Sequence, residues 1–205
     1  MTFPLMPNTT TFAPEPTVTY LTANGGNADV VSATSTEAAD RFIVFVSSAS
    51  ATAVMSSCSI NGVAAQVANS GNATFACAYV PTGTTVTATP TFSSGGTTTS
   101  SGMSALYAVY GLESPIWRSA TFSSGATSTS ASITIPQGGL IFVPVWLNND
   151  GQNPVFTNAT RDFESDNGNS FGLATGHRDA SAGGAYTVSV SVAVGTLYMG
   201  LGCLR

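Results

Sequence analysis

Apolar residues fall on every second position along most of this chain, and serine, threonine or other small residues fill the positions between them. The alternation is clearest near the C-terminus, at Tyr186, Val188, Val190, Val192 and Val194. A period of two places the apolar side chains on one face of a β-strand and the small ones on the other. The alternation resumes at Leu197 after Gly195, which suits the first central position of a type II′ turn. We therefore predict a C-terminal antiparallel hairpin, covered by a second apolar sheet.

Other segments carry equally strong strand and turn signals. The continuous apolar run at residues 42–46 predicts a strand that is buried on both faces or covered by a loop, and residues 140–147 are predicted to form the most apolar strand of the chain. Asn61-Gly62 separates two further strand segments, and this dipeptide is the strongest short signal for a hairpin. Turn residues recur roughly every 8–12 residues, as they do in sandwiches and jelly rolls. We predict an all-β protein with a single antiparallel, jelly-roll-like β-sandwich over residues 17–205.

The segment TFSSG occurs twice, at residues 91–95 and 121–125. Nothing else in the chain shares that spacing. We interpret the echo as low complexity in a chain rich in Ser, Thr and Gly, not as a true repeat.

Residues 1–16 differ from the rest. Four prolines prevent a helix there and favour an extended path. Large apolar residues are scattered among them without a period: Phe3, Leu5, Met6 and Phe12. Two interpretations remain open: a frayed terminus, or an arm whose apolar side chains dock on a neighbouring subunit. We take residues 1–16 as a docking arm and 17–205 as the sandwich domain.

Composition limits the partners. The 205-residue chain has five arginines, no lysine and a formal net charge of −5, so it lacks the basic surface that nucleic acid or an anionic membrane attracts. We see no charged and then apolar leader of the secretory kind, and no apolar run near the ~20 residues of a membrane helix. We therefore expect synthesis in a cytoplasm, with no nucleic-acid or membrane partner.

The three cysteines share their parity with apolar neighbours. Cys58, Cys77 and Cys203 are therefore predicted to be small buried residues with free thiols, which suits a reducing cytoplasm. A Cys58–Cys77 bridge between neighbouring strands is the alternative.

One segment could bind a cation. Asp162, Glu164 and Asp166 alternate, so on an extended segment their carboxylates point the same way, and grouped oxygen ligands can bind Ca²⁺. The same carboxylates are our candidates for a glycan site. The alternative is a solvated loop in which Arg161 pairs with one of them. We expect no other cofactor.

Other chemistry has weaker support. The single histidine, His177, lies in a GHRD segment that we interpret as a solvent-exposed loop, and the many serines make any Ser–His–Asp set uninformative. Cys and His residues do not have metal-site spacing, and no glycine-rich loop joins a strand to a helix. Trp117, beside Arg118, is predicted to be exposed and is a candidate for stacking on a glycan. We predict no catalytic residues and no enzyme activity.

Five motifs follow one another in a fixed order: DRFIVFV (40–46), SINGVAA (59–65), YVPTG (79–83), YAVYGL (107–112) and IPQGGL (135–140). From Arg41 onward this order resembles β-sandwich structural proteins of tailed bacteriophages and related particles, found as head decorations, head spikes or tail-fibre components. The resemblance implies a virion role and no catalytic residues.

Our hypothesis is therefore a non-enzymatic virion protein, made in the host cytoplasm. It would dock on other capsid or tail proteins through residues 1–16 and expose its loops to solvent or to a host receptor. We expect a homo-oligomer and take a trimer as the starting assumption. The alternative is a carbohydrate-binding module or adhesin that recognises a host surface glycan.

Overall fold

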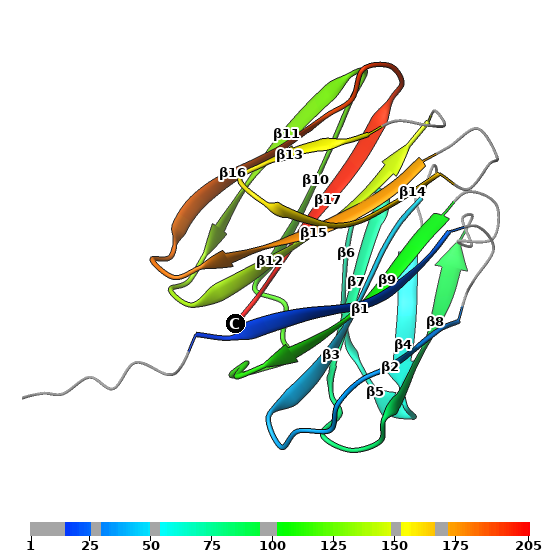
Figure 1. Ribbon diagram of the computed structural model, residues 1–205, viewed down its shortest axis with the longest axis vertical. Helices are drawn as coiled ribbons and strands as arrows, with labels where there is room; N and C mark the ends of the chain where they lie inside the picture. The colour runs from blue at the N-terminus through cyan, green and yellow to red at the C-terminus, as the bar shows by residue number, and fades with distance from the viewer. Residues whose placement is uncertain (1–14, 26–29, 50–53, 95–101, 149–152, 167–171) are drawn as a thin grey trace, which may run out of the picture.

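A computed structural model describes residues 15–25, 30–49, 54–94, 102–148, 153–166 and 172–205 (Figure 1). The predicted docking residues Phe3, Leu5, Met6 and Phe12 lie outside the described residues. Within them the chain forms strands and turns and no helix, so none of this part offers a helix that could cross a membrane. The predicted antiparallel, all-β sandwich class is confirmed, but the described residues form four sheets, the layers of two stacked sandwiches, where we predicted a single sandwich. The jelly-roll topology and the domain boundary at residue 16 stay predictions.

The first half of the chain builds two facing sheets. The first inner sheet has the order β1 (Thr17–Gly25), β9 (Gly102–Tyr110), β3 (Arg41–Ala49), β7 (Ala73–Tyr79) and β6 (Gln66–Ser70). The first outer sheet has the order β2 (Val31–Thr34), β8 (Thr85–Ser94), β4 (Val54–Ile60) and β5 (Val63–Ala64).

The second half builds two more sheets. The second inner sheet has the order β10 (Ser119–Gly125), β17 (Leu197–Leu204), β12 (Gly139–Leu147), β15 (Gly172–Ala180) and β14 (Thr160–Asp166). The second outer sheet has the order β11 (Ser128–Ile135), β16 (Gly184–Ser191) and β13 (Val155–Thr157). Figure 1 shows β10–β17 grouped apart from β1–β9, with each group folded as its own sandwich.

Three buried cores hold these sheets in four layers. Ile43 and Phe45 of β3 face the first outer sheet, whereas Phe42 and Val44 face a core shared by the two inner sheets. Strand β12 behaves in the same way: Ile141 and its neighbours at alternate positions face the second outer sheet, whereas Leu140 and Phe142 face the shared core. Both central strands are therefore buried on both faces, which agrees with their continuous apolar runs.

The predicted C-terminal hairpin is wrong. Strand β16 pairs with β11 and β13 in the second outer sheet, whereas β17 pairs with β10 and β12 in the second inner sheet. The apolar sides of β16 and β17 meet across the core between those sheets, where Val188 and Val190 share one cluster with Leu201. Alternation reveals an apolar face, but it does not reveal whether the covering strand lies beside that face or across from it.

The predicted hairpin at Asn61-Gly62 is confirmed. β4 pairs with β5 around this turn, and both turn residues have positive φ, 51° at Asn61 and 79° at Gly62. A type I′ turn needs that conformation at both central positions, and Asn-Gly supplies it at low cost.

The three thiols are free and buried, as predicted. Cys58 packs in the core of the first sandwich, Cys77 in the shared core and Cys203 in the core of the second sandwich. Because Cys58 and Cys77 face different cores, the alternative of a bridge between them is excluded.

Arg41 opens β3 and is fully buried. Its guanidinium group donates to four backbone carbonyls: Nε to Val80 (2.6 Å), Nη1 to Thr36 (2.8 Å), and Nη2 to Thr82 and Gly83 (2.9 Å each). One side chain thereby ties the residues before β3 to the turn between β7 and β8.

Candidate functional site

Four polar side chains meet where the two inner sheets face each other. We call them the interface cluster: Tyr107 on β9, Asp162 on β14, and Thr175 and His177 on β15. The Tyr107 and Thr175 hydroxyls lie 2.6 Å apart, and His177 Nδ1 lies 2.8 Å from each carboxylate oxygen of Asp162. The Tyr107 and His177 rings meet edge to face at 6.5 Å, which joins the two pairs.

A β-bulge turns Asp162 into the cluster. The register between β14 and β15 shifts between Arg161 and Phe163, so Asp162 is an extra residue in its strand. A bulge lets a strand re-aim one side chain without breaking the sheet. Phe163 stacks on Tyr20 of β1 at 5.9 Å, while Asp162 bonds to His177.

Burial controls the charge states of the cluster. The side chains of His177 and Asp162 are only 18% and 8% exposed. Burial lowers the pKa of His177, but the hydrogen bond and charge of Asp162, with a smaller effect of Asp179, outweigh it, and the net shift is upward. Burial and then the Asp162 charge raise the pKa of Tyr20 to about 12 and that of Tyr107 well above 10. Both phenols therefore stay neutral near pH 7.

A surface groove lies beside the cluster. Its lining includes His177, Arg178, Asp179, Asn158 and Thr160. Arg178 donates to the Asn158 carbonyl at 2.9 Å, and its guanidinium carbon lies 4.7 Å from the centre of the Tyr186 ring. His177 is therefore both a lining residue of the groove and the partner of Asp162.

The structure changes the interpretation of His177. The segment around it is not a loop but part of strand β15, which pairs with β12 and β14 in the second inner sheet. The His177 side chain is largely buried. The GHRD segment gave no sign of this, since its partner Asp162 is reached only through the bulge in β14.

The predicted calcium or glycan carboxylates do not share one orientation. Asp162 bonds to His177, whereas Glu164 forms an ion pair with Arg161 at 3.0 Å. The bulge breaks the alternation on which the prediction relied. The side chain of Asp166 lies outside the described residues, and among those that the structure describes, no three His, Cys, Asp or Glu residues gather as a metal site would require.

Trp117 is half-buried, in contrast to the exposed position that we expected. Its ring lies 5.1 Å from that of Phe75 and 6.2 Å from that of Phe142, and its indole N–H donates to the Gln66 carbonyl at 3.1 Å. Trp117 lies in the segment between β9 and β10 and packs against the shared core. Its predicted role in glycan stacking stays a prediction.

No known protein family, curated protein or solved structure matches this chain. The site is therefore interpreted from its own geometry. Each side chain of the interface cluster has a hydrogen-bonding partner inside the cluster, which is typical of a buried positioning network.

We expect the His177–Asp162 pair to make stability depend on pH. The imidazolium is favoured in the folded state, since the pKa of His177 there is above its ordinary value of 6.5. The stabilisation is therefore complete below about pH 6.5 and is lost as the pH rises through the folded-state pKa, with a slope below about 1.4 kcal/mol per pH unit. Urea unfolding at a series of pH values between 5.5 and 8.5 measures how the free energy of unfolding depends on pH.

His177→Gln is the matched control for this experiment, because the chain has no other histidine. The variant should lose this slope while keeping a hydrogen-bonding side chain at the position. Equal slopes for the natural protein and the variant would contradict the prediction.

Proposed function

We propose that this protein is a non-enzymatic structural component of a particle of the tailed-phage type, such as a capsid decoration, spike or tail-fibre subunit. It would dock on other particle proteins through residues 1–16. Its outer faces and loops would be turned to solvent or to a host receptor.

The four-layer stack carries this proposal. Three continuous cores hold the sheets together, which favours a rigid block over a hinged one. The outermost faces are covered by short hydroxyl side chains, as on β11, where the exposed positions are Ser128, Ser130, Ser132 and Thr134. Short side chains lose little conformational entropy when a flat surface is covered, so such faces suit broad contacts between subunits.

Density-gradient sedimentation tests the particle role. Particles are purified from a culture that expresses the gene, and each fraction is probed with an antibody raised against the purified protein. We expect the protein in the particle fractions. Its confinement to the top of the gradient, where a free 20.7 kDa chain stays, would exclude the proposal.

Truncation tests the docking arm separately. The chain without residues 1–16 should give the circular dichroism spectrum and thermal midpoint of the natural protein and yet fail to join particles. A full-length chain with serine in place of Phe3, Leu5, Met6 and Phe12 is the matched control, since it keeps the length and loses only the apolar side chains. Normal incorporation of either variant would refute the arm's role.

The second candidate is a carbohydrate-binding module, and the groove beside His177 favours it. Planar amide, guanidinium and carboxylate groups, such as those of Asn158, Arg178 and Asp179, are typical hydrogen-bonding partners of sugar hydroxyls. A glycan array decides: binding that disappears in Asp179→Ala supports this candidate, and no binding to any glycan favours the structural role.

A further inference from the structure

The two halves of the chain have the same topology. The order β1-β9-β3-β7-β6 of the first inner sheet becomes β10-β17-β12-β15-β14 in the second. The order β2-β8-β4 of the first outer sheet becomes β11-β16-β13. Each strand of the first half, apart from the two-residue β5, thus has one counterpart, and the counterparts follow the same order along the chain.

Residues inside the counterpart strands match as well. In the first outer sheet the hydroxyls of Ser32 and Thr87 lie 2.8 Å apart, and in the second those of Ser132 and Thr187 lie 2.7 Å apart. Each pair is made of facing residues in counterpart strands. The turn before β8 contains Gly83, with a φ of 83°, and the turn before β16 contains Gly183, with a φ of 69°.

Register fixes the equivalences at the shared core. Val44 of β3 lies opposite Cys77 and Tyr107, and Phe142 of β12 lies opposite His177 and Gly202. The equivalent pairs are therefore Val44 with Phe142, Cys77 with His177, and Tyr107 with Gly202. Phe75 and Thr175 lie two residues before Cys77 and His177 in their strands, so they are equivalent as well.

Contacts between the halves obey a twofold rule. If two copies pack around a twofold axis, every contact between different elements has a twin in which the elements exchange roles. The contact between β6 and β10 has its twin between β14 and β1. The contact between β7 and β17 has its twin between β15 and β9, and the contact between β9 and β12 has its twin between β17 and β3. β3 also contacts its own counterpart β12.

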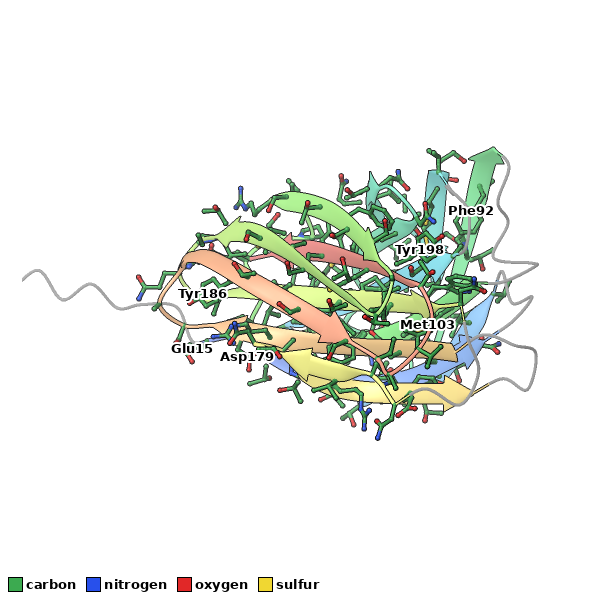
Figure 2. The ribbon with its side chains drawn as sticks, turned by 90° about the horizontal axis from the view of Figure 1, so that it is seen from above. Glu15, Phe92, Met103, Asp179, Tyr186 and Tyr198 are labelled. Atoms are coloured by element: carbon green, nitrogen blue, oxygen red, sulfur yellow. The ribbon has the colours of Figure 1, made fainter. Side chains whose placement is uncertain are left out.

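Near the axis, equivalent residues should meet each other. Met103 lies opposite Ser48, and Tyr198 lies opposite Trp146. Ser48 follows Val44 by four residues, as Trp146 follows Phe142, so Met103 and Tyr198 are equivalent. Both belong to one small cluster with Trp146, and Figure 2 shows their labelled side chains close together.

We propose that the inner sheet of each half is an interaction surface whose partner is the inner sheet of the duplicated sandwich in the same chain. The chain is then a fused dimer: one sandwich has been duplicated in tandem, and the two copies pack as the subunits of a twofold homodimer do.

The two copies have diverged in a way that holds them together as a pair. On one side of the axis, the large Phe75 packs on Gly202, where an added Cβ would lie 2.6 Å from the Phe75 ring. On the other side the sizes are exchanged, and the large Tyr107 meets the small Thr175. Two first halves would set Phe75 against Tyr107, and two second halves would set Thr175 against Gly202. Only the mixed pair fills the space without overlap.

The ends of the chain allow a direct test. Residues 111–118 link β9 to β10. Thr17 lies opposite Tyr110, and the Arg205 guanidinium donates to Glu113 at 2.9 Å, so the start of β1 and the end of β17 both lie at this linker. Twofold symmetry requires that a linker of the same length can also join β17 to β1.

The test is a permuted chain that runs from Glu113 to Arg205 and continues from Thr10 to Leu112, which gives the new linker the natural length. A second permutant keeps all of residues 1–16 as a longer linker. A natural-order chain cut by a protease between Leu112 and Glu113 measures the effect of opening the linker alone. We expect the permutant with the natural linker length to be monomeric, with a thermal midpoint within about 4 °C of the intact natural-order chain and above that of the cut chain, whose two fragments are no longer linked.

Two outcomes would overturn the proposal. Folding of the long-linker permutant alone would mean that the two connections are not equivalent. Failure of both permutants would mean that the halves are not interchangeable in order. The readouts are mass and thermal unfolding, so neither result depends on the particle role.

Discussion

Replacement of Arg41 by methionine should lower the free energy of unfolding by about 3 kcal/mol, because the protein loses four hydrogen bonds from a charged donor, one of them fully buried. Methionine fills similar space but donates no hydrogen bond, so the carbonyls of Val80, Thr82 and Gly83 lose the guanidinium donor, and that of Thr36 keeps only the longer bond from the Ser35 hydroxyl at 3.4 Å. Each acceptor that becomes buried without a partner is costly. Chemical denaturation monitored by circular dichroism measures the loss.

Arg118→Met is the matched control. Arg118 is exposed, so the same chemical change there should alter the free energy of unfolding by less than about 0.5 kcal/mol. Arg41→Lys adds a second comparison: a lysine ammonium keeps the charge but lacks the planar fork that reaches carbonyls in two loops. If Arg41→Met unfolds at the same denaturant concentration as the natural protein, the four hydrogen bonds do not stabilise the fold.

Gly200→Ala should destabilise the protein by about 3 kcal/mol, at the upper end of the usual cost of overpacking. Gly200 lies on β17 in the shared core, and an added Cβ would lie 2.1 Å from the Cβ of Ala73 on β7. Neither group can rotate away, so the two inner sheets would have to move apart. The same substitution at an open position would stabilise slightly, because alanine restricts the unfolded chain. A fall in the free energy of unfolding would therefore show that the two inner sheets are in close contact at Gly200, whereas a small rise would show that they are not.

A double-mutant cycle separates this clash from other effects. Ala73→Gly removes the opposing methyl group, so the double variant should recover at least about 1 kcal/mol relative to the sum of the single changes. Additive losses would show that Gly200 and Ala73 do not meet in solution.

Local patterns predicted much of the fold. Alternation and apolar runs identified the strands, and Asn61-Gly62 identified a turn, because these signals depend on neighbours in sequence. The partner of each strand was harder to predict, as β16 and β17 show: their apolar faces meet across a core, and a one-dimensional pattern does not distinguish that from a hairpin. The buried position of Arg41 was equally hard to predict, since three of its four acceptors, the carbonyls of Val80, Thr82 and Gly83, lie 39 to 42 residues away in sequence.

The candidate site and the duplication escaped sequence analysis for related reasons. Asp162 reaches His177 only because a bulge adds a residue to β14, and no composition signal marks that bulge. Residues 91–94 of the first TFSSG segment lie in β8 and the second segment lies in β10, which are not counterparts, so the visible repeat was unrelated to the structural one. The true equivalences, such as Thr87 with Thr187, are single Ser, Thr or Gly matches that such a chain shows by chance.

The positions of the three thiols make the protein its own folding probe. Burial raises the pKa of Cys58 and of Cys203 to about 12 and raises that of Cys77 further, so none forms the reactive thiolate while its surroundings are closed. Each lies in a different core. Alkylation followed by peptide mass analysis would therefore record, one cysteine at a time, whether the first sandwich, the second or the junction between them opens first.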